Sequence, residues 1–400
     1  MLFVSNLYPN PREPARGIFN RHTVRALAEQ VEVRVLAAVP WFPGSKSMTG
    51  IPERLDDDGV QVRYVRAFYT PLVLRNLHGK FFRSSIRRTV LDIRGEFPFD
   101  VLYGSWVYPD GYGVTLLARE LGVPCVLHAL GSDIHRYLDH PRRRRKVLEA
   151  LSRADHVVCV SRYLRDRVVE AGLEADRITV VYDGVDTELF GPRDRREARA
   201  RLGLPQDSRI ILFVGSLRPI KGPEHMVEAF RKLKCSTGEN LHLAIVGDGP
   251  LGESLREEVR ELGLADSVTF AGTRLHGEVP EWMSAADVLC LSSLDEGMPN
   301  VVLEALASGR PVVATNVGGV GEVINSESVG LLVQPGDPEA LAAGLREALR
   351  RKWDTGKLVA RAGEFTWQEH GRRIGEVLRA VTADRGSART PDGGPLKGRT

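Results

Sequence analysis

Two carboxylates, Glu296 and Glu304, stand in the string SSLDEGMPNVVLEALASGRPVVAT at 292–315. Glu296 lies in the loop after an apolar strand, and Glu304 lies inside the helix that the pattern predicts over 300–308. The first turn of a helix offers unpaired backbone N–H groups, which bind phosphate, while carboxylates accept hydrogen bonds from sugar hydroxyls. The string therefore predicts one pocket that suits a ligand with both kinds of group.

Two further loops could approach such a ligand. The turn GSLRPIKG at 215–222 places Arg218 and Lys221 between a strand and a helix start, where two cations would neutralise phosphate charge. The turn GDGP begins at Gly247, directly after another buried strand, and permits close backbone approach. Each turn also has an interpretation without a ligand. The turn at 215–222 could be a solvated turn with incidental cations, and the turn at 247–250 could be a tight strand–helix turn. The glycine-rich NVGGVGEVI at 316–324 is a third such turn.

Strands and helices alternate along the whole chain, which predicts two α/β domains with parallel sheets covered by helices. Continuous apolar runs indicate strands buried on both faces, and in the second half they lie at 210–214, 242–246, 268–270, 287–291, 311–314 and 330–333. The first half alternates less regularly, with strands expected at 2–5, 31–37, 60–65, 100–104, 124–128, 156–160 and 178–182. Ligands of such sheets bind beyond the carboxyl ends of the strands. The loops named above occupy that position.

The composition is that of an ordinary globular protein, with 42% hydrophobic and 27% charged residues in 400. A net charge of only +3 argues against a dedicated nucleic-acid binder. The four cysteines form no C-x-x-C pair, and three of them sit in apolar runs, which indicates buried free thiols in a reducing compartment. We find no signal-peptide core and no membrane-spanning segment, so we expect a cytoplasmic protein.

The small net charge hides a basic segment at 59–91, which contains no acidic residue. Its cations are interleaved with aromatic residues, and a second run of five cations spans 142–146. One interpretation is a solvated strand and helix face. The other is contact with anionic lipid headgroups, which would place the protein on the inner face of a membrane.

The string at 292–315 resembles the E-x7-E motif of the retaining glycosyltransferases of family 4, and the two turns at 215–222 and 247–250 are similar to those of the same family. Further similar segments are VSRYLRDRVVEAGL (160–173), YDGVDTELF (182–190), ADVLCLSS (286–293) and FTWQEH (365–370). The resemblance extends to about residue 381. Segments 8–22, 39–43 and 108–111 also look like transferases that build bacterial cell-surface polysaccharides, including the teichuronic-acid type.

The resemblance implies a GT-B fold, in which two facing Rossmann-like domains enclose a deep cleft. Domain boundaries would be 1–190 for acceptor binding and 191–365 for the nucleotide-sugar, with a helix at 366–381 returning to the first domain and a disordered tail at 384–400. The implied reaction moves a hexose-type sugar from a UDP- or GDP-sugar to a saccharide or lipid-linked acceptor, without a cofactor or a metal. The alternatives are a nucleotide-sugar epimerase of the same fold and a catalytically silent nucleotide-sugar-binding protein.

The resemblance also implies roles for individual residues. Glu296 would hold the transferred sugar, Arg218 and Lys221 the diphosphate, and Glu304 the ribose. Arg274 would lie beside the base, and Gly17 would approach the donor from the first domain. Backbone groups of the phosphate site are expected at Gly215, Ser216, Gly247, Gly297, Met298, Pro299 and Asn300.

The sequence departs from the family pattern at two places. Many members have Arg where this chain has Ser216, and Arg218 is the expected substitute. Many also have His directly before G-x-D, where this chain has Leu130. His128 either replaces that imidazole or is a core histidine at a strand end. Asp133 matches the pattern, and we expect it to serve the acceptor side or to fix its loop.

Overall fold

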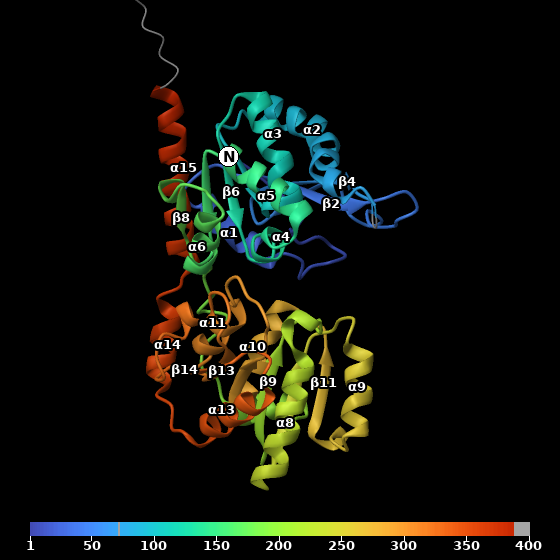
Figure 1. Ribbon diagram of the computed structural model, residues 1–400, viewed down its shortest axis with the longest axis vertical. Coiled ribbons are helices and arrows are strands. Elements are labelled where there is room, and N and C mark those ends of the chain that lie inside the picture. The colour runs from blue at the N-terminus through green and yellow to red at the C-terminus, as the bar shows by residue number, and fades with distance from the viewer. Residues whose placement is uncertain (71–72, 388–400) are drawn as a thin grey trace, which may run out of the picture. The chain divides into compact units, whose positions relative to one another are not determined.

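The computed structural model describes residues 1–70 and 73–387, which form two α/β units (Figure 1). Unit 1 comprises Met1–Cys159, Val168–Val181 and the chain from Gly371 onward. Unit 2 comprises Val160–Arg167 and Tyr182–His370. The segment 182–190 therefore groups with unit 2, whereas we expected the boundary after residue 190.

The sheet of unit 1 has eight strands in the order β3-β4-β2-β1-β5-β6-β7-β8. All neighbours are parallel except β3 and β4, which pair antiparallel at the edge of the sheet. The strands are β1 (Leu2–Ser5), β2 (Arg34–Trp41), β3 (Arg54–Asp57), β4 (Val60–Phe68), β5 (Leu102–Ser105), β6 (Cys125–Ala129), β7 (His156–Cys159) and β8 (Ile178–Val180). The exposed strand β3 was not predicted, because its charged sequence RLDD lacks an apolar pattern.

Helices cover both faces of this sheet. Helices α1 (Ile18–Ala28) and α15 (Trp367–Ser387) share one apolar core with alternate strand residues, including Phe3, Val35 and Tyr103. Helix α3 (Tyr112–Leu121) packs against both α2 (His78–Glu96) and α5 (Pro141–Arg153). The remaining helices are α4 (His135–Leu138) and α6 (Arg162–Glu170), with short turns at η1 (Arg75–Leu77), η2 (Val107–Gly111) and η3 (Ala175–Arg177).

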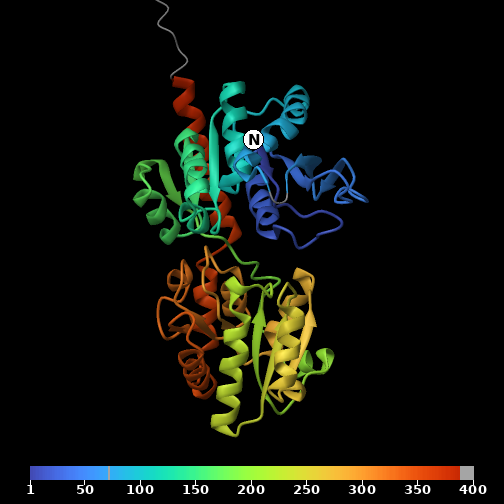
Figure 2. The same ribbon diagram turned by 45° about the vertical axis from the view of Figure 1, so that its right-hand side comes forward.

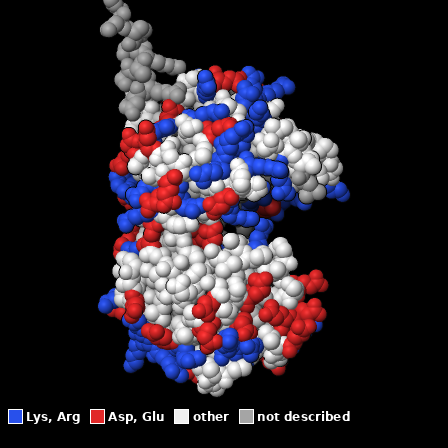
Figure 3. Space-filling model, in the orientation of Figure 1, with Lys and Arg blue, Asp and Glu red and all other residues white. Residues whose placement is uncertain are grey.

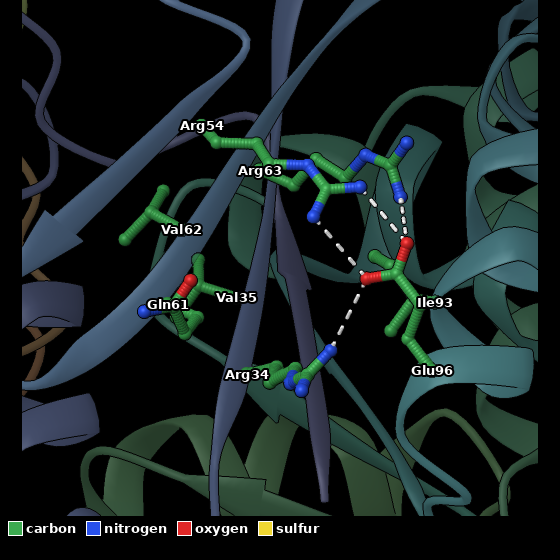
Figure 4. A pocket seen from close by; sticks show the side chains of 8 residues that line it. All are labelled: Arg34, Val35, Arg54, Gln61, Val62, Arg63, Ile93 and Glu96. Atoms are coloured by element: carbon green, nitrogen blue, oxygen red, sulfur yellow. Dashed lines mark hydrogen bonds and ion pairs between the residues drawn. The ribbon is translucent and has the colours of Figure 1, made fainter.

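An ion network fixes the end of α2 to the edge of the sheet. Arg54 Nη2 lies 2.8 Å from Glu96 Oε1, and Arg34 Nη1 lies 3.5 Å from Glu96 Oε2. Arg63 adds a third guanidinium group at 3.7 Å (Figure 4). Together these contacts hold β2, β3, β4 and the last turn of α2 around a cavity of about 20 Å³, roughly the size of one water molecule.

The sheet of unit 2 has six parallel strands in the order β11-β10-β9-β12-β13-β14. Because successive strand residues point to opposite faces, Ile211 and Phe213 of β9 enter a core with α8, α9 and α13, while Ile210 and Leu212 are buried on the other face. Helices therefore cover both sides of this sheet as well (Figure 2). The strands are β9 (Arg209–Val214), β10 (Leu241–Val246), β11 (Val268–Gly272), β12 (Val288–Leu291), β13 (Val312–Thr315) and β14 (Gly330–Val333).

The helices of unit 2 include one that begins at Asn300, where the pattern predicts a helix start. They are α7 (Arg195–Leu202), α8 (Pro223–Thr237), α9 (Gly252–Glu261), α10 (Val279–Ala285), α11 (Asn300–Ala307), α12 (Val320–Val323), α13 (Pro338–Arg350) and α14 (Thr355–Gly363), with turns at η4 (Pro219–Lys221), η5 (Ala265–Ser267) and η6 (His276–Glu278). At the end of the chain α15 continues through Ser387, so residues 384–387 are helical where we expected the tail to begin. The rest of that tail lies outside the described residues.

Two other expectations concern the burial of the cysteines and the presence of a membrane-spanning helix. Cys125, Cys159 and Cys290 are buried, as expected, and Cys235 is exposed; all four are free thiols. Among the helices of residues 1–70 and 73–387, none combines the length and apolar content needed to cross a bilayer.

Candidate functional site

Four loops of unit 2 follow the carboxyl ends of β9, β10, β12 and β13, and backbone hydrogen bonds join the first three. Leu217 N–H donates to Asp248 O at 3.0 Å, which connects the first loop to the second. Leu294 N–H donates to Ile220 O at 2.8 Å, which connects the first loop to the third. The residues that the sequence assigns to a phosphate and sugar site therefore come together on one edge of one sheet.

Two glycines allow these loops to lie in direct contact. A Cβ on Gly247 would lie 1.9 Å from Gly215 O, and a Cβ on Gly318 would lie 1.7 Å from Glu296 O. Both glycines also have positive φ values, 132° and 54°, which other residues rarely adopt. Only glycine fits at these positions. The glycine residues of the two turns are therefore explained by the close packing of one loop backbone against another.

The central contact of this edge is an ion pair between Lys221 and Glu296. Lys221 Nζ lies 2.7 Å from Glu296 Oε1, and Ser293 Oγ donates to the same oxygen at 2.6 Å. The Glu296 side chain is only 8% exposed, whereas Lys221 is 30% exposed. A carboxylate has about four lone-pair positions, so Glu296 keeps accepting capacity for a ligand hydroxyl beside a partly exposed cation.

Helix α11 begins at Asn300, directly after the loop that carries Glu296. Gly297, Met298 and Pro299 are buried in that loop. Pro299 has no backbone N–H and cannot donate to a phosphate, so the expectation of an amide at every position from 297 to 300 is wrong there. Asp183 is a buried carboxyl; burial raises its pKa to about 7, and its interaction with the side chain of Asn300 opposes that rise.

Glu304 lies inside α11 and pairs with a histidine that the sequence did not indicate. His276 Nε2 lies 3.0 Å from Glu304 Oε1, and the imidazole ring packs 5.2 Å from the ring of Phe190. Burial lowers the pKa of His276, but the hydrogen bond and the charge of Glu304 outweigh it, so the pKa is raised overall. A half-buried imidazole therefore orients the carboxylate that was expected at the ribose.

Three other predicted residues of unit 2 are more exposed. Arg218 is exposed on the loop after β9, and Ser216, in the same loop, is half-buried. Arg274 is exposed after β11, with its guanidinium 5.9 Å from the ring centre of Trp282. Arg218 and Arg274 lie at the same edge of the sheet as Lys221, but they are not part of the ion pair between Lys221 and Glu296.

In unit 1, Asp133 accepts hydrogen bonds from backbone N–H groups of nearby residues. Its carboxylate accepts hydrogen bonds from Gly131 N–H at 2.8 Å and Val107 N–H at 2.9 Å, and Leu130 N–H adds a third at 3.1 Å. The side chain is fully buried, and burial raises the pKa of Asp133. Of its two expected roles, this geometry supports fixing the loop.

His128 and Gly17 also lie in unit 1. His128 is fully buried in β6, with its ring 5.8 Å from that of Tyr103, which supports its interpretation as a core histidine. Leu130 lies beyond the last residue of β6. Gly17 precedes α1 with a φ of 61°.

The residues that sequence reasoning missed are mostly partners of the predicted ones. Ser293, His276 and Asp183 contact Glu296, Glu304 and Asn300 respectively. Ser293 could have been found from its place directly after the strand, but His276 is far along the chain from Glu304. Within residues 1–70 and 73–387, no group of three or more His, Cys, Asp or Glu side chains is placed to hold a metal ion.

Two family models match the chain along nearly its whole length. "Glycosyltransferase Family 4" matches residues 17–189, and "Glycosyl transferases group 1" matches residues 194–366. A D-inositol 3-phosphate glycosyltransferase of Nocardioides sp. is 32% identical over an alignment 360 residues long, which covers 82% of this chain and 78% of that protein. The chain therefore belongs to the glycosyltransferases that these two family models describe. A second D-inositol 3-phosphate glycosyltransferase, from Catenulispora acidiphila, is 31% identical over 92% of both chains.

Solved structures show that this glycosyltransferase has the GT-B fold. Sucrose-phosphate synthase from Thermosynechococcus elongatus superposes with a TM-score of 0.78 at 22% identity, covering 96% of this chain and 99% of that one. HepE of Anabaena, in complex with UDP-glucose, superposes with a TM-score of 0.74 at 22% identity, covering 95% and 99%. The expected pair of Rossmann-like domains is thereby confirmed.

Proposed function

We propose that this glycosyltransferase moves a hexose-type sugar from a UDP- or GDP-sugar to an acceptor hydroxyl, with retention of anomeric configuration. The observation that carries the proposal is the Lys221–Glu296 pair, 2.7 Å apart, on the edge where four glycine-containing loops meet. In this proposal Lys221 is the cation that binds the diphosphate, and Glu296 is the carboxylate that binds the sugar. The solved complex of HepE with UDP-glucose supports this donor class.

The chemistry asked of these residues is electrostatic. The bond between the anomeric carbon and the diphosphate breaks, and negative charge develops on the leaving phosphate oxygen. Lys221, Arg218 and backbone N–H groups of Gly297 and Met298 stabilise that charge. The same phosphate oxygen accepts the acceptor's hydroxyl proton as the new glycosidic bond forms on the same face of the sugar. Because the cations neutralise the diphosphate, the proposed reaction needs no metal.

The remaining residues hold the donor in place. Glu304, oriented by His276, accepts hydrogen bonds from the ribose hydroxyls. Glu296 accepts them from the transferred sugar, and the exposed Arg274 lies beside the base. Binding energy from these nonreacting groups positions the anomeric carbon for attack.

The test uses Glu296→Gln, which keeps the size of the side chain and removes its charge. With UDP-glucose and GDP-mannose as donors, we expect release of UDP or GDP to fall about 100-fold or more relative to the wild type. Glu253→Gln, a substitution of an exposed carboxylate on α9, is the matched control and should be unaffected. Full activity of the Glu296 variant would overturn the site. NMR of the product reports anomeric configuration, and activity in excess EDTA tests metal independence.

The same assay separates the alternatives of an epimerase and a silent binding protein. An epimerase would isomerise the sugar of UDP-glucose without an acceptor. A silent protein would bind UDP, raising the melting temperature by mass action, without ever releasing it from UDP-glucose. Retained transfer with no isomerisation supports the proposal.

For the acceptor we propose a saccharide or lipid-linked saccharide, as in the synthesis of cell-surface polysaccharide or glycolipid. A second candidate is a phosphorylated inositol, which the names of the relatives from Nocardioides sp. and Catenulispora acidiphila favour. The two are distinguished by offering D-inositol 3-phosphate and a polyprenyl-diphosphate saccharide with UDP-glucose. Turnover with only one of them decides the acceptor class.

We also propose peripheral contact with the inner face of the cell membrane through part of the basic segment. Arg83 and Arg87 form ion pairs with Glu120, so these two cations are partly neutralised. By contrast, Arg75 and Lys80 are exposed. In the sequence they follow Val73 and Leu74, which are 63% and 52% exposed. The turn η1 packs against the basic helix α5. In Figure 3, blue and red side chains are interleaved over unit 1.

Sedimentation with lipid vesicles tests this contact. We expect the protein to pellet with phosphatidylglycerol vesicles more than with phosphatidylcholine vesicles, and less when salt is raised. Replacing Arg75 and Lys80 with Glu should abolish the difference, whereas Lys357→Glu, on an exposed position of α14, should not. Equal pelleting with both lipids would contradict the proposal.

A further inference from the structure

The loop between β1 and α1 is anchored at its first residue by a buried carboxyl from another part of the chain. Asn6 N–H donates to Asp110 Oδ2 at 2.5 Å, and Asn6 Nδ2 donates to Asp110 Oδ1 at 2.9 Å. Asp110 lies in η2, shortly after β5, and is fully buried. Both oxygens of one carboxyl therefore serve a single residue more than a hundred positions away, which is a specific, two-point attachment.

The rest of the loop is tied to that attachment. Arg16 Nε donates to Asn6 O at 3.0 Å, and Asn20 Nδ2 donates to Leu7 O at 2.5 Å. Gly17 approaches so closely that a Cβ there would lie 2.3 Å from Leu7 O. A displacement of Asn6 would therefore move the backbone around Gly17, because the two ends of the loop contact each other.

We propose that Asp110 is a positioning residue for sugar transfer, which holds the loop from Asn6 to Gly17 in the conformation that the reaction requires. The inference rests on the proposed function and on the family resemblance, which implies that Gly17, at the end of this loop, is a donor-binding residue. Asp110 itself is buried, so it acts through Asn6 and not by touching the substrate.

The ionisation of Asp110 should control how firmly the loop is held. Burial raises its pKa to about 8, the hydrogen bonds from Asn6 and the charge of Arg16 oppose that rise, and the charge of Asp133 adds to it. Tyr137 also faces the two carboxyls. Because the bonds to Asn6 favour the ionised form, ionisation must by linkage strengthen those bonds. The loop is therefore held more tightly as the pH rises through about 8.

Hydrogen exchange of the full-length chain provides the first test. We expect protection factors of the amides between Asn6 and Gly17 to increase from pH 7 to pH 9 in the wild type. Asp110→Asn keeps the shape but places an amide donor opposite a donor of Asn6, so the increase should disappear. Asn6→Ala removes only the hydrogen bond from Asn6 Nδ2 to Asp110 Oδ1. It should reduce the pH-dependent increase in protection without changing the buried carboxyl. Unchanged pH-dependent protection in both variants would overturn the inference.

Kinetics with UDP-glucose provide the second test. We expect Asp110→Asn to lower kcat about tenfold, to leave the Kd for UDP within about twofold because the nucleotide residues lie in unit 2, and to lose the rise in rate near pH 8. Asp92→Asn, an exposed carboxylate of α2, is the matched control. If the protein transfers no sugar at all, the proposed function fails, while hydrogen exchange still decides the role of Asp110.

Discussion

The carboxyl edges of the two sheets use acidic side chains in opposite ways. In unit 2, Glu296 and Glu304 pair with side chains from other loops, Lys221 and His276. In unit 1, Asp133 and Asp110 accept hydrogen bonds from backbone N–H groups of neighbouring loops and are fully buried. An acid after a parallel strand is therefore a ligand-binding candidate only where a titratable or cationic partner leaves part of it accessible.

The largest effect should follow from removing the cation of the unit 2 edge. Lys221→Gln leaves Glu296 without its ion-pair partner and takes a positive charge from the leaving diphosphate. We expect kcat/KM for UDP-glucose to fall about 100-fold to 1,000-fold. Steady-state kinetics measure the loss, and the conservative Lys221→Arg should recover part of it. A loss below about threefold would mean that the two edges do not differ in function.

A loss of stability should result from the corresponding change in unit 1. Asp133→Ala leaves the N–H groups of Val107, Leu130 and Gly131 without their acceptor, which costs about 1–3 kcal/mol for each unsatisfied group. Denaturant unfolding should show unit 1 destabilised by several kcal/mol, while isothermal calorimetry should find UDP affinity retained. If UDP binding were lost and stability kept, Asp133 would be a ligand residue like Glu296.

The smallest effect concerns His276, which sharpens the comparison within unit 2. Its raised pKa means that the charged imidazolium pairs with Glu304 at low pH and that this pairing is lost as the pH rises through the folded-state pKa. We expect His276→Gln to weaken UDP binding about threefold to tenfold near pH 6 and less near pH 8. Calorimetry at both pH values measures the difference, and an equal effect at both would exclude a charged pair.

Most of the fold could be predicted because the chemistry of buried parallel strands is local. Continuous apolar runs such as those of β9 and β10 have few alternatives to full burial. Strand β3 and the last turn of α2 carry charged residues, and they are joined by the tertiary contacts of Glu96 with Arg34 and Arg54. The free energy that stabilises these segments comes from contacts with residues distant in the sequence, which a local pattern does not show.

The candidate site was predictable to a similar degree and for a similar reason. Lys221 and Glu296 follow strands that are neighbours in one sheet, so their approach follows from topology. The two expected roles of Asp133 were distinguished only by its hydrogen bonds. Asp110 stood in the segment 108–111, which resembles other transferases, but the sequence assigned it no role. A carboxyl's role depends on what its oxygens accept, and those donors come from distant segments.

The sequence by itself determined the α/β class, the glycosyltransferase family and the edge of the sheet on which Glu296, Glu304 and Lys221 would lie. Apolar periodicity, glycine turns and the spacing of acids are properties of the chain alone. Only the tertiary structure decided which acids face a ligand and which hold the backbone. Burial and hydrogen-bond partners, which set the cost of a charge, exist only once separate loops have come together.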